Sequence, residues 1–319
     1  MTMTILLDSN VWRYIVDANA TAKVLQAALK SSHRIATAPA VVYDALRTEN
    51  PAIRHALVSA MTLSHWKRLM PEAYSEANEL KVELQRLRSP WLRHPMDLTL
   101  YKRLRYDWIR SRGGFWDRVR IDADGERRRI DGSLLELARA DALVSREEGK
   151  LMPSQWQSVS LTELVASPQS PISGWMGEPV ELWRLNALTS FQHAMSLDDH
   201  PYRDWLNGEV SLDVMMFQSE ELTRFWLYEA DTQRMQRCWL RSAFEFQQRF
   251  HKITDGTPAD SQLGTYLVDV DVMLSADKNF VRFAERCRQE APFLMGCSTL
   301  IPGGEDAVDA VLAALDARR

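Results

Sequence analysis

Short apolar segments alternate with amphipathic ones at the two ends of the chain, and this alternation constrains the fold more than any other feature. Near the N-terminus, Ile5-Leu6-Leu7 is followed by Asp8-Ser9-Asn10, where an amphipathic stretch begins. Asp, Ser and Asn are favoured at such junctions because their side chains accept hydrogen bonds from the free amides of a new helix. Residues 34–37 form a second short strand, and a proline suited to the first turn of another helix follows. The order strand, helix, strand, helix predicts a parallel sheet with helices on its faces.

The same alternation returns near the C-terminus. An apolar segment at residues 270–274 ends at Ser275-Ala276-Asp277, much as the first apolar segment ends at Asp8. This segment is predicted to be a strand, and the residues around it show the helical pattern again. The other expected elements are a helix at residues 258–267, a helix at 278–290, a strand at 293–295 and a terminal helix after Gly303-Gly304.

The middle of the chain has a different pattern. Helical periodicity dominates residues 65–249, and strand-like alternation is scarce there. We expect residues 1–64 and 250–319 to form one α/β domain, a parallel sheet flanked by helices, and residues 65–249 to form a large all-helical insertion into it. All tryptophans except Trp12 fall within this middle stretch. The helices expected there cover residues 71–88, 97–112, 133–148, 179–195 and 231–250.

Composition excludes several classes of protein. Hydrophobic residues make up 45% of the chain and charged residues 26%, as in globular proteins. No apolar stretch approaches the ~20 residues that span a bilayer, so we expect no membrane segment. The N-terminal residues lack the basic region and apolar stretch of a signal peptide. Three widely spaced cysteines indicate no disulfide framework, and together these features predict a cytoplasmic protein.

Acidic residues end two of the expected parallel strands, at Asp8 and Asp277. In open α/β sheets, ligand sites form beyond the carboxyl ends of the strands, where the strand order reverses. If the two strands are neighbours at that point, their acids converge. Asp260 lies near the start of the helix before the second strand, and Asp44 lies one turn into the helix that follows residues 34–37. Four carboxylates at one sheet edge repel one another unless a divalent cation lies among them, and hard oxygen ligands suit Mg²⁺ or Mn²⁺.

Each of these acids also has a purely structural interpretation. Asp8 and Asp277 can be the N-caps of the helices that follow them. Asp260 lies three residues after Thr257, as in a capping box, and Asp44 can be a solvated helix position. Four acids in this order on these elements nevertheless favour a shared site over four independent caps.

Four segments of the chain resemble, in order, the acidic motifs of PIN domains. This family includes the toxin ribonucleases of bacterial toxin–antitoxin operons and the nuclease domains of RNA-processing factors. The last segment is the most specific, since an apolar strand followed by Thr/Ser-x-Asp-x-x-Phe is a recognisable ending of the family. The second motif normally carries Glu where this chain has Asp44, and the resemblance covers under half of the chain. The segments are ILLDSNVW at residues 5–12, PAVVYDAL at 39–46, ADSQLGTY at 259–266 and VMLSADKNF at 272–280.

The resemblance implies a PIN-like fold and a metal-dependent nuclease. Asp8, Asp260 and Asp277 are implied to be the metal ligands, with Asp44 completing the catalytic set. The implied reaction is hydrolysis of a phosphodiester bond, in single-stranded RNA, by water that Mg²⁺ or Mn²⁺ activates. The resemblance to toxin ribonucleases also implies a protein inhibitor or other protein as a candidate partner. The supporting polar positions are Asn10 and Ser275.

The net charge of −4 conceals an asymmetry. Residues 1–130 hold 22 Lys and Arg against 14 Asp and Glu, whereas the remainder holds 17 against 29, together the 39 and 43 of the chain. Basic residues interleaved with tryptophan suit single-stranded nucleic acid, because cations track phosphates and aromatic rings stack on bases. Alternatively, the tryptophans form the core of a helical subdomain, and the arginines are solvated or pair with acids. The arginines expected to contact nucleic acid are Arg103, Arg105, Arg110 and Arg112.

An alternative hypothesis keeps the PIN-like fold but assigns it no catalytic activity. In it the chain is a catalytically silent PIN-like scaffold whose helical insertion binds a protein partner. Aspartate at position 44 in place of the family's glutamate and the tryptophan-rich insertion both leave room for this hypothesis.

Overall fold

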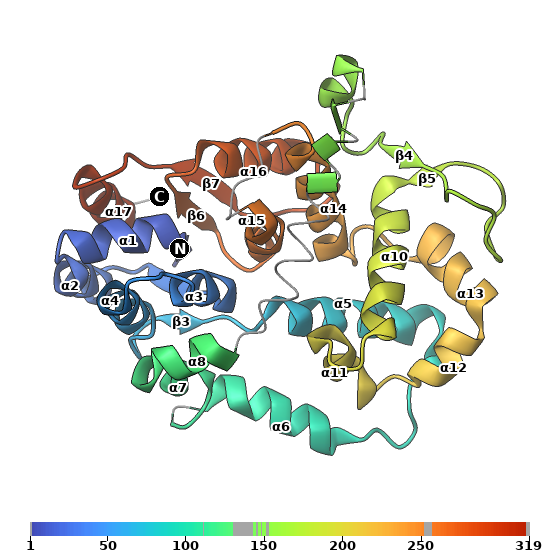
Figure 1. The fold of residues 1–319 in the computed structure, drawn as a ribbon, viewed down its shortest axis with the longest axis horizontal. Coiled ribbons are helices and arrows are strands. Elements are labelled where there is room, and N and C mark those ends of the chain that lie inside the picture. Colours follow the sequence, from blue (N-terminus) through green and yellow to red (C-terminus); the bar gives the residue numbers. More distant parts are fainter. Residues whose placement is uncertain are drawn as a thin grey trace.

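Five parallel strands form one sheet in the α/β part of the chain (Figure 1). The computed structural model describes residues 2–110, 112–129, 143–144, 146–147, 149–150, 153–251 and 257–316. The strands are β1 (Thr4–Leu7), β2 (Arg34–Thr37), β3 (Lys67–Arg68), β6 (Val272–Ser275) and β7 (Cys297–Leu300). Their order is β3-β2-β1-β6-β7, and every neighbouring pair is parallel. The expected α/β class with a parallel sheet is therefore confirmed.

The central strand is β1, and the order of the sheet reverses beside it. The chain adds β2 and β3 on one side of β1, whereas β6 and β7 lie on the other. Leu7 pairs with Leu274, and the amide of Asp8 donates to the carbonyl of Leu274 at 3.0 Å. Leu6 and Leu7 are fully buried, as inner strands of parallel sheets are. The two strands that lead into Asp8 and Asp277 are thus neighbours at the reversal point, which meets the condition set out from the sequence for their acids to converge.

Helices accompany the strands of the α/β part, and several of them begin where the sequence supplies a capping side chain or a proline. They are α1 (Ser9–Asp17), α2 (Thr21–Lys30), α3 (Pro39–Leu46), α4 (Pro51–Met61), α15 (Thr257–Gly264), α16 (Lys278–Glu290) and α17 (Asp306–Asp316). Asp8 caps α1, Asn50 caps α4 and Asp277 caps α16, each by accepting hydrogen bonds from amides of the first turn. The terminal helix α17 packs against α1 and α2, and α16 packs against β7.

Two strands lie outside the positions expected from the sequence. The pair Lys67–Arg68 joins β2, so the sheet extends past residue 64 into the stretch expected to be helical. Two residues carry too little apolar pattern to be recognised as a strand. The last strand, expected at residues 293–295, lies further along the chain as β7. Gly296 passes so close to Val270 that a Cβ there would lie 2.2 Å from the Val270 carbonyl oxygen, so the chain joins the sheet only after this glycine.

Between β3 and α15 lies a mostly helical stretch, called here the middle segment (residues 69–251). Its helices are α5 (Glu72–Leu87), α6 (Leu98–Ile109), α7 (Phe115–Ile121), α8 (Ala123–Arg129), α10 (Leu182–Ser196), α11 (Pro201–Asn207), α12 (Leu212–Phe217), α13 (Ser219–Arg224) and α14 (Gln236–Gln248). It also holds an antiparallel ribbon of β4 (Val165–Ala166) and β5 (Val180–Glu181). The expectation of an all-helical stretch is therefore wrong in this detail, because a two-residue ribbon leaves no alternation to detect. The helix expected at residues 133–148 lies largely outside the described residues.

Tryptophan side chains belong to the core rather than to an exposed aromatic surface. The buried ones are Trp12, Trp66, Trp91, Trp116, Trp183, Trp205, Trp226 and Trp239. Trp226 packs against Phe191 with ring centroids 5.7 Å apart. The others, Trp108, Trp156 and Trp175, are partly buried and pack against the same core. The structural interpretation of the tryptophans is the correct one, since rings inside the core cannot stack on bases.

A buried ion pair network joins the middle segment to the sheet. Arg237 of α14 is 8% exposed and pairs with Glu79 of α5. Its Nη2 also donates to Asp269 Oδ1 at 2.6 Å, just before β6. In addition, α14 packs against α10, α15 and α16, and Figure 1 shows it between the two parts of the molecule. Removing the guanidinium would leave two acids without their shared cation, which is costly for buried charges.

We expect Arg237→Ala to lower the free energy of unfolding by about 3 to 5 kcal/mol, the cost of breaking a buried pair by removing one partner. Urea denaturation at pH 7 measures this loss. The control is Arg288→Ala, because Arg288 pairs with Glu285 at 2.9 Å on an exposed face of α16. The control should lose at most about 1 kcal/mol. Equal losses in the two variants would contradict the role assigned to Arg237.

Candidate functional site

Asp8 lies at the carboxyl end of β1, at the point where the strand order reverses. It is 7% exposed, so its carboxylate depends on donors from the protein. Its Oδ1 accepts from the backbone amide of Ser9 at 2.6 Å. Its Oδ2 accepts from Ser275 Oγ at 2.6 Å and from Asn10 Nδ2 at 2.8 Å. Two of these donors belong to α1 and one to β6, so the support is complete only when β1 and β6 pair.

Ser275 and Asn10, the two expected supporting residues, extend this network to the turn after β6. Ser275 is fully buried, and its Oγ also accepts from the backbone amide of Asp277 at 3.0 Å. Asn10 Oδ1 accepts from the backbone amide of Ala276 at 3.1 Å. Side chains that follow both strands therefore fix the position of Asp277 relative to Asp8.

Asp277 is the N-cap of α16, in the same way that Asp8 is the N-cap of α1. Its Oδ1 accepts from the amides of Asn279 at 2.7 Å and Phe280 at 3.1 Å. The structural interpretation of both acids as caps is thus correct. Capping does not exclude a site, because a carboxylate offers about four lone pairs and the cap of Asp277 uses only one of its oxygens.

Asp260 and Asp44 come from two helices that pack against each other. Asp260 lies in the first turn of α15, Asp44 lies in the last turn of α3, and α15 contacts α3. Asp44 is 37% exposed at its side chain and pairs with Arg47 at 3.6 Å. The capping box expected from Thr257 to Asp260 involves a side chain outside the described residues.

Two of the four acids, Asp8 and Asp260, have raised pKa values. Burial raises the pKa of Asp8, the hydrogen bond from Ser275 lowers it, and the charges of Asp44 and Asp277 raise it again, with a net increase. Burial also raises the pKa of Asp260 well above its ordinary value, and the charges of Asp277, Asp8 and Asp44 add to the increase. This mutual repulsion indicates that the four carboxyl groups face the same region of the molecule.

The donor chemistry of this region suits a hard divalent cation. Carboxylate oxygens are preferred ligands of Mg²⁺ and Mn²⁺, and a cation would relieve the repulsion that raises the two pKa values. Within the ranges that the structure describes, however, no three Asp, Glu, His or Cys side chains lie close enough together to hold a metal ion. The region has the charge and the ligand atoms that suit a metal ion.

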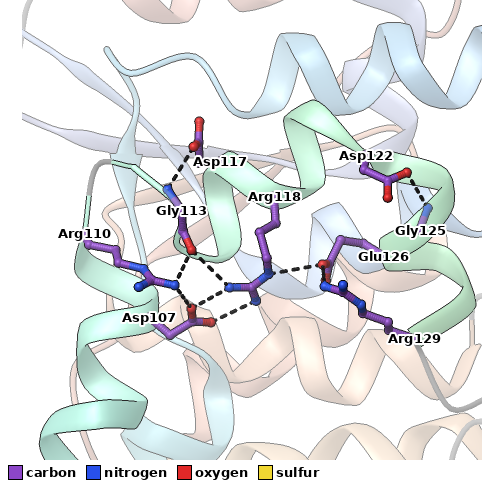
Figure 2. Close-up of polar contacts among 9 residues, drawn as sticks. All are labelled: Asp107, Arg110, Gly113, Asp117, Arg118, Asp122, Gly125, Glu126 and Arg129. Carbon is purple, nitrogen blue, oxygen red and sulfur yellow. Dashed lines mark hydrogen bonds and ion pairs between the residues drawn. The ribbon is translucent and has the colours of Figure 1, made fainter.

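The arginines expected to contact nucleic acid divide into two kinds. Arg110 donates to Asp107 Oδ1 at 3.0 Å and to the carbonyl of Gly113. Its neighbour Arg118 lies between Asp107 and Glu126, with Nη2 2.9 Å from Asp107 Oδ2 and Nε 3.1 Å from Glu126 Oε1 (Figure 2). These guanidinium groups hold α6, α7 and α8 together, so Arg110 is already engaged within the chain. The exposed ones are Arg103, Arg105 and Arg112.

Three residues near the acids were not predicted as site residues from the sequence. Thr37, at the carboxyl end of β2, is fully buried, and its hydroxyl has no hydrogen-bond partner among the described residues. Lys278 and Arg282 are exposed on α16, in the two turns that follow Asp277. A search for polar residues at every strand end would have found Thr37, and a search for cations one turn apart after an acid would have found the other two.

A surface hollow lies elsewhere, between α5 and the start of α14. Its lining includes Ser75, Glu79, Gln233 and Arg237, and none of the four acids lines it. It therefore belongs to the middle segment and not to the acidic region.

Comparison with known proteins identifies no relative. No protein-family model, no curated protein and no solved structure matches the chain. No helix in the described part of the chain is long and apolar enough to cross a membrane. What the acidic region does must therefore be argued from its own residues.

We expect Asp260→Asn to stabilise the metal-free protein at neutral pH. The pKa of Asp260 is raised well above 3.8, so the folded state keeps this proton as pH rises while the unfolded state loses it. The wild-type free energy of unfolding should therefore fall by about 1.4 kcal/mol for each pH interval of one between about pH 4 and the raised pKa. Asparagine does not titrate and should not show this fall.

Urea denaturation in EDTA between about pH 4 and pH 8 measures the difference. The gap between variant and wild type should be small at the acidic end and widen as pH rises. The control Asp198→Asn, at a fully exposed acid, should stay within about 0.5 kcal/mol of wild type throughout. A constant gap across the whole range would show that charge at position 260 is not the cause.

Proposed function

We propose that this chain is a PIN-like, metal-dependent nuclease that hydrolyses phosphodiester bonds in single-stranded RNA. The observation that carries the proposal is the placement of Asp8 and Asp277 at the ends of neighbouring strands, at the reversal point of the sheet, where the charges of Asp277, Asp8 and Asp44 all act on Asp260. Burial is the largest cause of the raised pKa values of Asp8 and Asp260, but the charges of neighbouring acids add to them, and acids far apart would not repel one another in this way. The order of the four motifs along the chain adds the likeness to PIN domains, and the choice of RNA rests on that likeness.

The proposed roles follow from where each acid lies. Asp8, Asp260 and Asp277 would hold Mg²⁺ or Mn²⁺, and Asp44 would complete the set. A bound divalent ion supplies an activated water and stabilises charge that develops on the phosphate. Ser275 and Asn10 are positioning residues: their hydrogen bonds to Asp8 Oδ2 fix the plane of its carboxylate.

The middle segment, in this proposal, is an insertion into a PIN-like domain that extends the acidic region. Two contacts support this role. Its helix α8 packs against α3, which carries Asp44, and its last helix α14 packs against α15, which carries Asp260. Exposed cations on α6 and in the turn after it would then guide the RNA backbone toward the acids, since positive charge follows phosphates. These cations are Arg103, Arg105 and Arg112.

We expect Asp8→Asn to reduce cleavage of a single-stranded RNA by at least about a hundredfold, as loss of an electrostatic catalytic group does. Cleavage by wild type should require Mg²⁺ or Mn²⁺ and stop in EDTA. The matched control is Asp17→Asn on the same helix, where Asp17 is half exposed and pairs with Arg13 at 2.7 Å. The measurement is a gel assay on folded, purified variants. Cleavage by Asp8→Asn at the wild-type rate would refute the proposal.

A second function, that of a scaffold without catalysis, is supported by a separate observation. No three acids in the described ranges are close enough to hold a metal, and three protein donors already satisfy the carboxylate of Asp8. This arrangement suits a catalytically silent PIN-like scaffold whose middle segment binds a protein partner.

Calorimetric titration with Mn²⁺ separates the two functions. For the nuclease we expect uptake of one or two ions per chain, absent in Asp277→Asn, and release of protons from the acids with raised pKa values. Repeating the titration in buffers of different ionisation enthalpy counts those protons. A scaffold without the site should give only the heat of dilution.

A further inference from the structure

Two cations on α16 differ from the other charged residues of that helix. Arg286 pairs with Glu290 at 2.8 Å, and Arg288 pairs with Glu285 at 2.9 Å. Lys278 and Arg282 are exposed, and among the described residues neither has a carboxylate within ion-pair distance. Residues four apart share one face of a helix, so these two unpaired charges lie side by side.

Neutral groups hold the guanidinium of Arg282 in place. Its Nη2 lies 2.7 Å from the ring Nε2 of His251 and 3.3 Å from Asn279 Oδ1. Its carbon Cζ lies 5.4 Å from the centre of the Phe283 ring. His251 follows α14 and also packs against Phe283, with ring centroids 5.0 Å apart. None of these neighbours cancels the positive charge, so the group is ordered and still able to bind an anion.

This pair of cations lies beside the acidic region. Asn279, which accepts from Arg282, donates its own backbone amide to Asp277 Oδ1 at 2.7 Å. Lys278 follows Asp277 directly in the first turn of α16. The dipole of α16 adds positive potential at this end of the helix. Cations and acids thus meet at the start of one helix.

We propose that Lys278 and Arg282 form a phosphate-binding subsite that holds the RNA backbone next to the acidic region. The proposal rests on the proposed nuclease function and names how its substrate is held. A polyanion that approaches four carboxylates is repelled unless cations lie on its path. The planar, multidentate guanidinium of Arg282 suits a phosphate group, and Lys278 adds a mobile second charge.

The test measures binding apart from cleavage. The probe is a fluorescently labelled oligouridylate of about 20 nucleotides, titrated by anisotropy in EDTA at several KCl concentrations. We expect Arg282→Ala to weaken binding about fivefold to tenfold, the effect of about 1 to 1.4 kcal/mol. The slope of log affinity against log salt should become shallower by about 0.7, the value for one phosphate contact on a single strand. Lys278→Ala should act in the same direction.

Two variants on the same helix serve as controls. Arg288→Ala removes a cation that is already paired, so both affinity and slope should stay at the wild-type values. Arg282→Lys keeps the charge and should restore the slope, though not the full affinity. This variant also answers the objection that alanine merely disturbs α16, and circular dichroism checks the fold of each.

The outcomes for binding and cleavage are independent. Weaker binding and a shallower slope in Arg282→Ala support the subsite even if no RNA is cleaved, in which case the nuclease fails alone. If RNA is cleaved while Arg282→Ala and Lys278→Ala bind like Arg288→Ala, the subsite is wrong and the nuclease stands. Wild type that does not bind the probe at the lowest salt also overturns the subsite.

Discussion

A buried carboxylate is the constraint around which the α/β part of this molecule is arranged. Asp8 is withdrawn from water, and a charge in that position is unfavourable without hydrogen bonds from the protein. Ser9 and Asn10 come from the helix that follows it, but Ser275 comes from a strand at the other end of the chain. The acid is therefore supported only when β1 and β6 are neighbours, and that adjacency is also the reversal point of the sheet.

The same adjacency explains why the acids are electrostatically strained. Asp277 is fixed near Asp8 by Ser275, while the packing of α15 on α3 adds Asp260 and Asp44. Burial and the charges of neighbouring acids raise the pKa of Asp8 and of Asp260. Asp44 forms an ion pair with Arg47. Natural proteins retain such unfavourable arrangements mainly where function requires them.

Some of this architecture could be predicted from the sequence, because the signals were local. Asp8 and Asp277 end apolar strands and cap the next helices, and both facts follow from a few adjacent residues. The helix over residues 278–290 could be placed to the residue for the same reason. β3 and the ribbon of β4 with β5 could not, since two residues show no periodicity.

Ion pairs between residues far apart in the chain also could not be predicted from the sequence. Glu79 and Arg237 give no sign in the sequence that they meet, although their ion pair joins α5 to α14. The engagement of Arg110 and Arg118 with Asp107 was hidden for a related reason, because charge counts do not reveal which partner each residue selects. The strand ends on which Asp8 and Asp277 lie could therefore be predicted, whereas the partners of distant charged residues could not.

The pairing of β1 with β6 has a consequence for folding during synthesis. β2 follows β1 closely along the chain, so the β1–β2 pair can form early in synthesis. The other edge of β1 must wait for Leu274, which is made near the end. At typical translation rates the wait is on the order of tens of seconds. During that time an apolar strand edge stays open, the kind of surface that pairs with other nascent chains. Producing this protein without aggregation should therefore depend on chaperones that cover the waiting strand.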